Sequence, residues 1–191
     1  MTIDEIKEVV KIKYTNNINR FNHIIGVYEM AMKLANHYGV SSEEVAIAAL
    51  FHDYTKYDSI DDQVKYINKE DVLKYQDTPV IYHALSASKL IKEEFHIDNE
   101  LISSAISKHV WGNVKMNMTD KIVLISDKIE LGRTYNGVDY LRRLAFQDID
   151  QAIYEFLVEN IEYNQREGFE IHPEQYKVVK KFKEQLDEKN K

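Results

Sequence analysis

Four histidines and two aspartates recur along this chain with residue types and spacing that suit a metal site. The dipeptide His52-Asp53 ends an apolar run that starts at Val45, so one rigid element presents an imidazole beside a carboxylate. The other members lie on four further predicted helices: His23, His83, His109 and Asp127. The order His, His-Asp, His, His, Asp therefore predicts that five helices contribute to one site.

The four histidines share a position on the apolar faces of their helices. The other three fall near helix ends or in loops: His37, His96 and His172. One inward histidine is more often a hydrogen-bonded core residue than a ligand. Four of them, together with two inward acids, favour a shared cation.

The two aspartates strengthen this interpretation. Burial of Asp53 and Asp127 without a counter-charge costs several kcal/mol or forces protonation. A divalent cation keeps both ionised and accepts neutral imidazoles as further ligands. For Asp127, an ion pair with Lys128, Arg133 or Lys56 is the alternative.

The absence of cysteine leaves nitrogen and oxygen as ligand atoms, which suits iron, manganese, zinc, cobalt or nickel. Such an ion lowers the pKa of a bound water and polarises a phosphoryl oxygen. Phosphoryl transfer also needs cations for the equatorial oxygens, and Arg20, Lys56 and Arg133 lie near the predicted ligands. Each of the three is otherwise an ordinary solvated charge.

Composition limits the class of protein and partner. The 191 residues fit one domain, which we expect to span 1–191, with a core at about 15–165 and a C-terminal helix at 173–190 packed on it. The 25 basic and 32 acidic residues give a net charge of -7, which argues against a nucleic-acid or anionic-membrane partner. No long apolar segment or signal-peptide pattern is present, so we expect a cytoplasmic protein.

Hydrophobic residues recur at helical spacing through most of the chain. We therefore expect an all-α bundle of about nine helices, with short helices in the polar stretch 61–76. Gly39 is predicted to end one helix, and Ser41 and Glu44 to form a capping box for the next. Asp98 is predicted to cap a later helix, and Pro173 to open the last one.

Three segments together match a known pattern: Arg20-Phe-Asn-His23-Ile-Ile-Gly26-Val27, His52-Asp53-Tyr-Thr-Lys56 and Asp127-Lys-Ile-Glu130-Leu-Gly-Arg133. With the six ordered residues, they resemble the HD superfamily of metal-dependent phosphohydrolases. Within it, the chain is similar to the symmetrical bis(5'-nucleosyl)-tetraphosphatases. The similarity runs from about residue 15 to the C-terminal helices.

The resemblance implies an HD-type helical bundle that hydrolyses diadenosine tetraphosphate to two ADP, with iron as the first candidate metal. It implies a metal held by four residues: His23, His52, Asp53 and Asp127. His83 and His109 would complete the pocket, by binding substrate phosphates or a second metal.

The resemblance also implies roles in substrate binding and catalysis. Three basic residues would face the phosphates: Arg20, Lys56 and Arg133. Residues 168–173, with His172, would lie along the nucleoside. Asp53 or Asp127 would orient the attacking water, and His83 or His109 would stabilise charge or protonate the leaving oxygen. Lys56 would assist catalysis at the phosphates.

The chain departs from the family pattern at Val110, Ser126 and Leu131, and the first departure affects a possible phosphate contact. The family reads His-Thr-x-Gly where this chain has His109-Val110-Trp111-Gly112, so a hydroxyl that could donate to phosphate is missing. One neutral hydrogen bond contributes about 0.5 to 1.5 kcal/mol, so activity is compatible with its loss. Val110 stays in the expected substrate-binding set, and Trp111 offers either a stacking face for a base or core packing.

Three other functions remain open at this point. They are a different nucleotide phosphohydrolase of the same superfamily, a nucleotide-sensing module without turnover, and a purely structural helical protein. In the enzymatic interpretations the partner is a small molecule, a dinucleoside polyphosphate or a nucleoside diphosphate. A homodimer is also compatible with the sequence.

Overall fold

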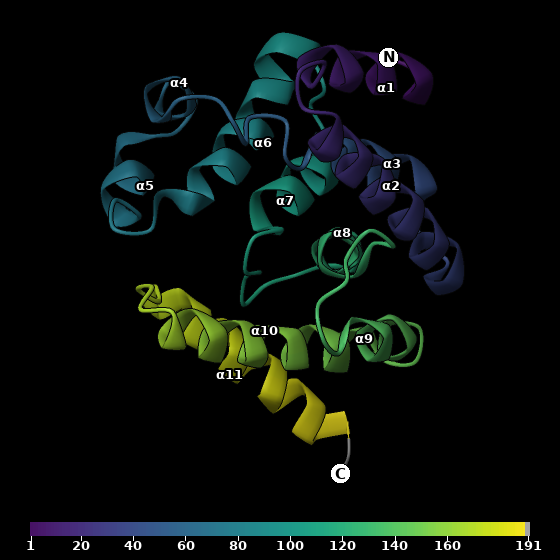
Figure 1. The fold of residues 1–191 in the computed structure, drawn as a ribbon, viewed down its shortest axis with the longest axis vertical. Helices are drawn as coiled ribbons and strands as arrows, with labels where there is room; N and C mark the ends of the chain where they lie inside the picture. Colours follow the sequence, from purple (N-terminus) through teal and green to yellow (C-terminus); the bar gives the residue numbers. More distant parts are fainter. Residues whose placement is uncertain (190–191) are drawn as a thin grey trace.

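The computed structural model describes residues 1–189, and within that range every regular element is helical (Figure 1). The α-helices are α1 (Ile3–Lys13), α2 (Ile18–Tyr38), α3 (Ser42–Phe51), α4 (Ile60–Val64), α5 (Lys69–Lys74), α6 (Tyr82–Phe95), α7 (Glu100–Lys108), α8 (Met118–Ile129), α9 (Val138–Ala145), α10 (Ile149–Arg166) and α11 (Pro173–Lys189). A 3₁₀ turn, η1 (Pro79–Ile81), precedes α6. The all-α prediction is confirmed. None of the described helices combines the length and hydrophobicity needed to cross a bilayer.

Helix α8 lies at the centre of the molecule. In Figure 1 it lies between an upper group of helices, α1 to α7, and a lower group, α9 to α11. It contacts α2, α3 and α7 on one side and α9 and α10 on the other. All its residues from Ile122 to Asp127 are buried as a result. A buried acid on such a helix requires a partner.

Helix α3 explains how the His-Asp pair reaches the interior. Its residues from Val45 to Phe51 are all buried, because it packs against α1, α2, α7 and α8. His52 takes the C-cap position of this apolar helix. The chain therefore leaves α3 inside the protein, and His52 and Asp53 are placed in its core.

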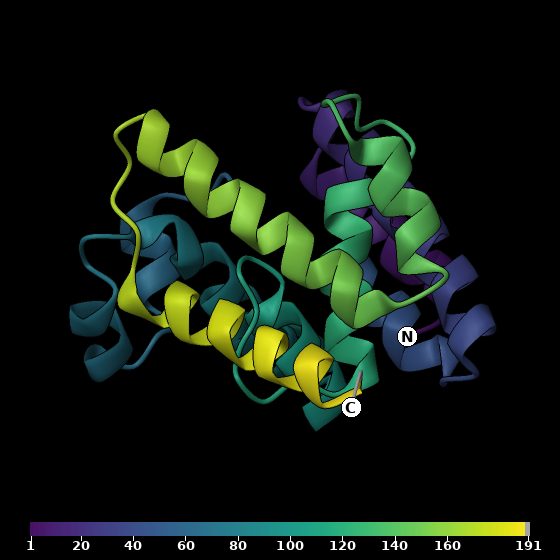
Figure 2. The ribbon, with the colours of Figure 1, turned by 90° about the horizontal axis from the view of Figure 1, so that it is seen from below.

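Helices α10 and α11 lie side by side, as Figure 2 shows. The apolar residues of α11 that face the core are Val178, Phe182 and Leu186. The last helix begins at Pro173, as predicted. Its predicted end at residue 190 lies outside the described residues. Because α10 packs on α8, the C-terminal pair supports the helix that carries Asp127.

The helix ends differ in part from the prediction. Gly39 ends α2 with a φ of 65°, in the left-handed region that glycine tolerates. The capping box at Ser41 is wrong, because the Ser41 hydroxyl donates to the Glu44 carboxylate and caps no backbone N–H. The cap of α7 is Asn99 and not Asp98, since the Asn99 side chain accepts from the backbone of the first turn.

Candidate metal centre

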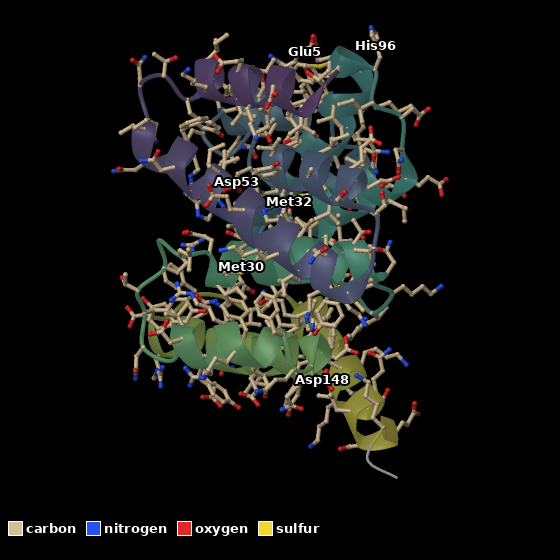
Figure 3. The ribbon with its side chains drawn as sticks, turned by 90° about the vertical axis from the view of Figure 1, so that its right-hand side faces the viewer. Glu5, Met30, Met32, Asp53, His96 and Asp148 are labelled. Atoms are coloured by element: carbon tan, nitrogen blue, oxygen red, sulfur yellow. The ribbon has the colours of Figure 1, made fainter. Side chains whose placement is uncertain are left out.

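Six buried side chains converge beside α8. They come from five elements, as the sequence predicted: His23 from α2, His52 and Asp53 from the end of α3, His83 from α6, His109 from the end of α7, and Asp127 from α8. The His23 side chain is 10% exposed and the other five residues are 6% exposed or less. Figure 3 shows Asp53 beside α2. Ligand atoms in three overlapping groups of these residues lie within 4.8 Å of one another.

The carboxylate of Asp53 lies between two pairs of histidines. Its Oδ2 atom faces the first pair, 3.3 Å from His52 Nε2 and 3.7 Å from His23 Nε2. Its Oδ1 atom faces the second pair, 3.1 Å from His83 Nε2 and 3.5 Å from His109 Nε2. Asp53 is therefore shared by two groups of ligand atoms.

Asp127 completes the first group. Its Oδ1 atom lies 3.0 Å from His23 Nε2 and 3.9 Å from His52 Nε2. Asp127 also pairs with Lys128 Nζ at 2.6 Å and with Arg133 Nη2 at 2.9 Å. The ion pair that the sequence offered as an alternative is thus present together with the contacts to the histidines.

Backbone carbonyls fix the orientation of two imidazoles. His52 Nδ1 lies 2.7 Å from the carbonyl oxygen of Ala49, and His109 Nδ1 lies 2.7 Å from that of Ile106. A carbonyl oxygen only accepts, so the proton of each neutral ring is on Nδ1 and the Nε2 lone pair faces the cluster. Histidines that bind metals usually have this arrangement.

Two buried nitrogens at the cluster have no hydrogen-bond partner among the described residues: His23 Nε2 and His52 Nε2. A buried polar atom in that state costs about 1–3 kcal/mol. Both nitrogens face the oxygens of Asp53 and Asp127, at 3.0 to 3.9 Å. Donor atoms about 2.1 Å from one cation, at right angles to each other, lie about 3.0 Å apart. The four residues therefore fit a divalent metal.

Charges within the cluster keep the carboxylates ionised. Burial alone raises the pKa of Asp53 and Asp127, but His52 beside Asp53 and Lys128 beside Asp127 bring each pKa well below its usual range. Burial lowers the pKa of His109 to about 3, so this ring is neutral at pH 7. Burial lowers the pKa of His52, but Asp53 outweighs burial and raises it, so a metal binds this ring in competition with a proton. Ionised carboxylates and neutral imidazoles are the states in which these groups bind metals.

Basic side chains border the cluster. Those expected at the phosphates are all present there: Arg20, Lys56 and Arg133. Arg20 Nη1 lies 2.6 Å from Asp53 Oδ2, and Lys56 Nζ lies 3.2 Å from His83 Nε2. Lys128 is a further cation at this edge, which the sequence analysis treated only as an ion-pair partner. The cluster therefore has cationic groups available for an anionic ligand.

Glu130 is a member of the site to which the sequence analysis gave no role. Its side chain is buried, and its carboxylate lies 3.2 Å from His23 Nδ1 and accepts from the backbone N–H of Gly132. The carboxylate places the His23 proton on Nδ1 and leaves Nε2 for the cluster. Gly26 makes room for it, because a Cβ there would lie 2.6 Å from Glu130 Oε2. The sequence feature that could have indicated its role is the position of Glu130 in the third motif, three residues after Asp127.

His172, which was expected along the nucleoside, packs against aromatic rings. His172 is stacked on Trp111, with 5.9 Å between ring centroids and 9° between planes, and packs against Tyr75 at 4.9 Å. Trp111 is buried, so it serves in core packing. Val110 follows His109 and is half-buried. Nucleoside contacts by Val110 and His172 stay predictions.

Two hollows open beside the cluster, and Arg133 lines both. The first has a volume of about 500 Å³ and lies between the start of α2 and residues 130–133, where His23 reaches it. The second has a volume of about 820 Å³ and extends along α10 from Phe156 to Arg166. Both volumes fall in the range of small-molecule sites, roughly 300–1,000 Å³.

The model of the HD domain family matches residues 20–175, a range that contains all six clustered residues. Two curated relatives are named bis(5'-nucleosyl)-tetraphosphatase, symmetrical. The one from Bacillus subtilis (strain 168) is 29% identical over 178 residues, which are 92% of this chain and 95% of that protein. The one from Staphylococcus aureus (strain NCTC 8325 / PS 47) is 33% identical over 161 residues, 81% of each chain.

A solved structure shares this fold over its whole length. It is described as a "predicted HD superfamily hydrolase involved in NAD metabolism" from Clostridium acetobutylicum. The TM-score is 0.85 and the sequence identity 27%, with 97% of this chain and 98% of that chain covered. The arrangement of helices around α8 is therefore common to both proteins.

Proposed function

Because this chain belongs to the HD domain family, we propose that it is a phosphohydrolase that cuts dinucleoside tetraphosphates symmetrically, so that diadenosine tetraphosphate gives two ADP. The resemblance found in the sequence is confirmed by the family match. The observation that carries the function is the buried cluster of His23, His52, Asp53 and Asp127 bordered by basic side chains.

A divalent metal belongs to this function, and we propose iron as its identity. His23, His52, Asp53 and Asp127 would hold it, and the unpartnered Nε2 atoms of the two histidines support that assignment. A donor set of imidazole and carboxylate without sulfur suits iron among other transition metals. When bound, such an ion supplies an activated water and a polarised phosphoryl oxygen.

The basic residues of the site bind and orient the phosphates. In the structure, Arg20 is paired with Asp53 and Arg133 with Asp127. As the phosphates enter, these guanidinium groups exchange a carboxylate oxygen for a phosphate oxygen, to which they can donate two parallel hydrogen bonds. Charge that develops on the equatorial oxygens is thereby compensated.

We assign to His83 the hydrogen bond that stabilises the charge on the leaving ADP oxygen, because burial lowers the pKa of this ring and keeps it a neutral donor. His83 Nε2 lies 3.1 Å from His109 Nε2 and 3.1 Å from Asp53 Oδ1. His109 carries its proton on Nδ1, so its Nε2 accepts and the proton of this contact is on His83 Nε2. Lys56, 3.2 Å from the same atom, adds positive charge beside the leaving group.

We propose that one nucleoside lies in the second hollow, of about 820 Å³ along α10, which we call the α10 hollow. The nucleoside would also contact the segment 168–173, which follows α10. Arg166, at the end of the hollow, precedes that segment by two residues. Val110 and His172 would contact this nucleoside. We also propose that residues 1–191 form one catalytic domain, which the packing of α11 on α10 supports.

Product analysis tests the function. The purified protein, supplied with Fe²⁺ or Mn²⁺, is expected to convert diadenosine tetraphosphate into ADP as the only nucleotide product. His52→Ala and Asp53→Ala should abolish turnover, whereas His37→Ala, a change at an exposed residue of α2, should not. Formation of orthophosphate or pyrophosphate would indicate a different nucleotide phosphohydrolase, and tight binding without product would indicate a sensing module.

A further inference from the structure

Symmetrical cleavage leaves one nucleoside diphosphate on each side of the broken bond. The protein must therefore accommodate a nucleoside on both sides of the cluster, and the α10 hollow accounts for one. We propose that the second nucleoside binds in the other hollow, of about 500 Å³, between the start of α2 and residues 130–133, which we call the α2 hollow. This assignment rests on the proposed function.

The α2 hollow is continuous with the cluster. His23, Arg20 and Arg133 all line it, so a phosphate chain that starts at the cluster can extend into it. Arg20 is the connecting residue, because it contacts Asp53 at 2.6 Å and also lies over the ring of Tyr57 at 5.3 Å. The Arg20 Nε atom is buried and has no hydrogen-bond partner among residues 1–189, which leaves a donor for an anionic ligand.

Tyr57, which lines the α2 hollow next to Arg20, provides a stacking surface. The residue is 59% exposed, although a tyrosine is more often half-buried or more. Its orientation is fixed by the hydrogen bond that Arg20 Nη2 donates to its hydroxyl at 3.1 Å and by an edge contact with Tyr14 at 6.2 Å. An exposed ring that is already held in place loses little entropy when a base stacks on it.

The wall that α2 contributes is polar. Asn19, Asn22 and Glu29 are exposed, line the hollow and recur at helical spacing on the face that also carries His23 and Gly26. An asparagine amide presents a donor beside an acceptor, which matches the amine and ring nitrogen of adenine. Glu29 offers an acceptor for a ribose hydroxyl or an amine. At Gly26 the wall has no side chain of its own, and the Glu130 carboxylate occupies the space beside it.

The opposite wall supports the same assignment. It is formed by residues 130–133, the turn that follows α8, and Figure 3 shows this green segment below the start of α2. Arg133 lines both hollows, so it is placed to contact the phosphates of either half of the substrate. Two hollows that share one arginine suit a substrate with two equal halves.

The number of ADP molecules bound per chain tests the proposal. At saturation, calorimetric titration of the Mn²⁺-loaded full chain is expected to give two ADP per chain, since product occupies both hollows. Tyr57→Ala and, independently, Asn22→Leu should reduce this to one. Tyr57→Ala should also raise the KM for diadenosine tetraphosphate by about tenfold or more, as expected for the loss of base stacking.

Two controls separate this proposal from the proposed function. Tyr140→Ala removes a tyrosine on α9 that is 48% exposed and lines neither hollow, and it should leave stoichiometry and KM unchanged. Adenosine 5'-tetraphosphate lacks the second nucleoside, so Tyr57→Ala should raise its KM by a smaller factor than the KM for diadenosine tetraphosphate. A single ADP in the unmodified protein, or an unchanged KM in Tyr57→Ala, would overturn the α2 site. Failure of the unmodified protein to form ADP would overturn the proposed function instead.

Discussion

His23 and Glu130, 107 residues apart in the chain, form a buried hydrogen bond of 3.2 Å between α2 and the residue that ends α8. The Glu130 carboxylate is held from a second direction by the backbone N–H of Gly132. Glu130 lies outside the group of six clustered residues, and its contribution is therefore to orientation. It decides which nitrogen of His23 faces Asp127.

Glu130→Gln is expected to weaken metal binding about 10- to 100-fold and to leave the fold intact, because an amide can donate to His23 Nδ1 and so favour the wrong tautomer. Titration of the metal-free protein with Mn²⁺ measures the change. Glu93→Gln, at an exposed position of α6, is the matched control. Equal Mn²⁺ affinities of Glu130→Gln and the unmodified protein would contradict an orienting role.

Gly26→Ala is expected to destabilise the protein by about 1–3 kcal/mol, because the new Cβ would lie 2.6 Å from Glu130 Oε2. At an ordinary helical position, a glycine-to-alanine change raises the free energy of unfolding by about 0.5–1 kcal/mol. A decrease in Gly26→Ala would therefore indicate the steric conflict with Glu130. Urea unfolding measures it. In a Glu130→Ala background the penalty should disappear, and its persistence there would show that another neighbour is responsible.

Metal removal should lower the melting temperature and leave the protein folded. An ion at 100 times its Kd stabilises the native state by about 2.7 kcal/mol. Thermal unfolding with a chelator and with added Mn²⁺ measures the shift. His52→Ala should abolish it and His37→Ala should preserve it. A shift that survives in His52→Ala would place the ion elsewhere.

The acid stability of the C-terminal helices should depend on Asp150. Burial raises the pKa of this carboxyl, but Lys121 at 2.6 Å and Lys189 at 3.0 Å outweigh burial, so the pKa is lowered in the folded state. A lowered pKa gives stability that is present above the unfolded value of about 3.9 and is lost as the pH falls through the folded value. Asp150→Asn should therefore cost about 1 kcal/mol at pH 7.

The same difference should shrink below about pH 4, where Asp150 of the unfolded chain becomes protonated, and should be lost as the pH falls through the lowered pKa of the folded state. Urea unfolding of both proteins at pH 7 and pH 3, with chelator present, tests this. A constant difference at the two pH values would mean that packing, and not charge, explains the effect of the substitution.

The positions of the clustered histidines could be predicted from the periodicity of hydrophobic residues along the helices. His23, His83 and His109 lie on the apolar faces of helices, and a face that must be buried brings its polar members inside with it. His52 and Asp53 follow an apolar helix that ends in the core. These positions depend on the local pattern of hydrophobic and polar residues, which can be recognised in a single sequence.

Contacts between distant segments were the part that sequence did not reveal. The bond from His23 to Glu130 depends on how α2 crosses α8, and the exposure of Tyr57 depends on the packing of the turn after α3. The prediction of the cap of α7 was wrong for a different reason. Asp98 and Asn99 are adjacent and equally suited to capping, so only the observed backbone geometry distinguishes them.

The pairs Arg20–Asp53 and Arg133–Asp127 also bear on how the protein matures. Each buried carboxylate already has a counter-charge from the chain itself, so a newly synthesised chain can fold before it meets an ion. Metal loading then becomes a step that can follow folding. In that order, folding of the chain does not depend on the supply of the metal.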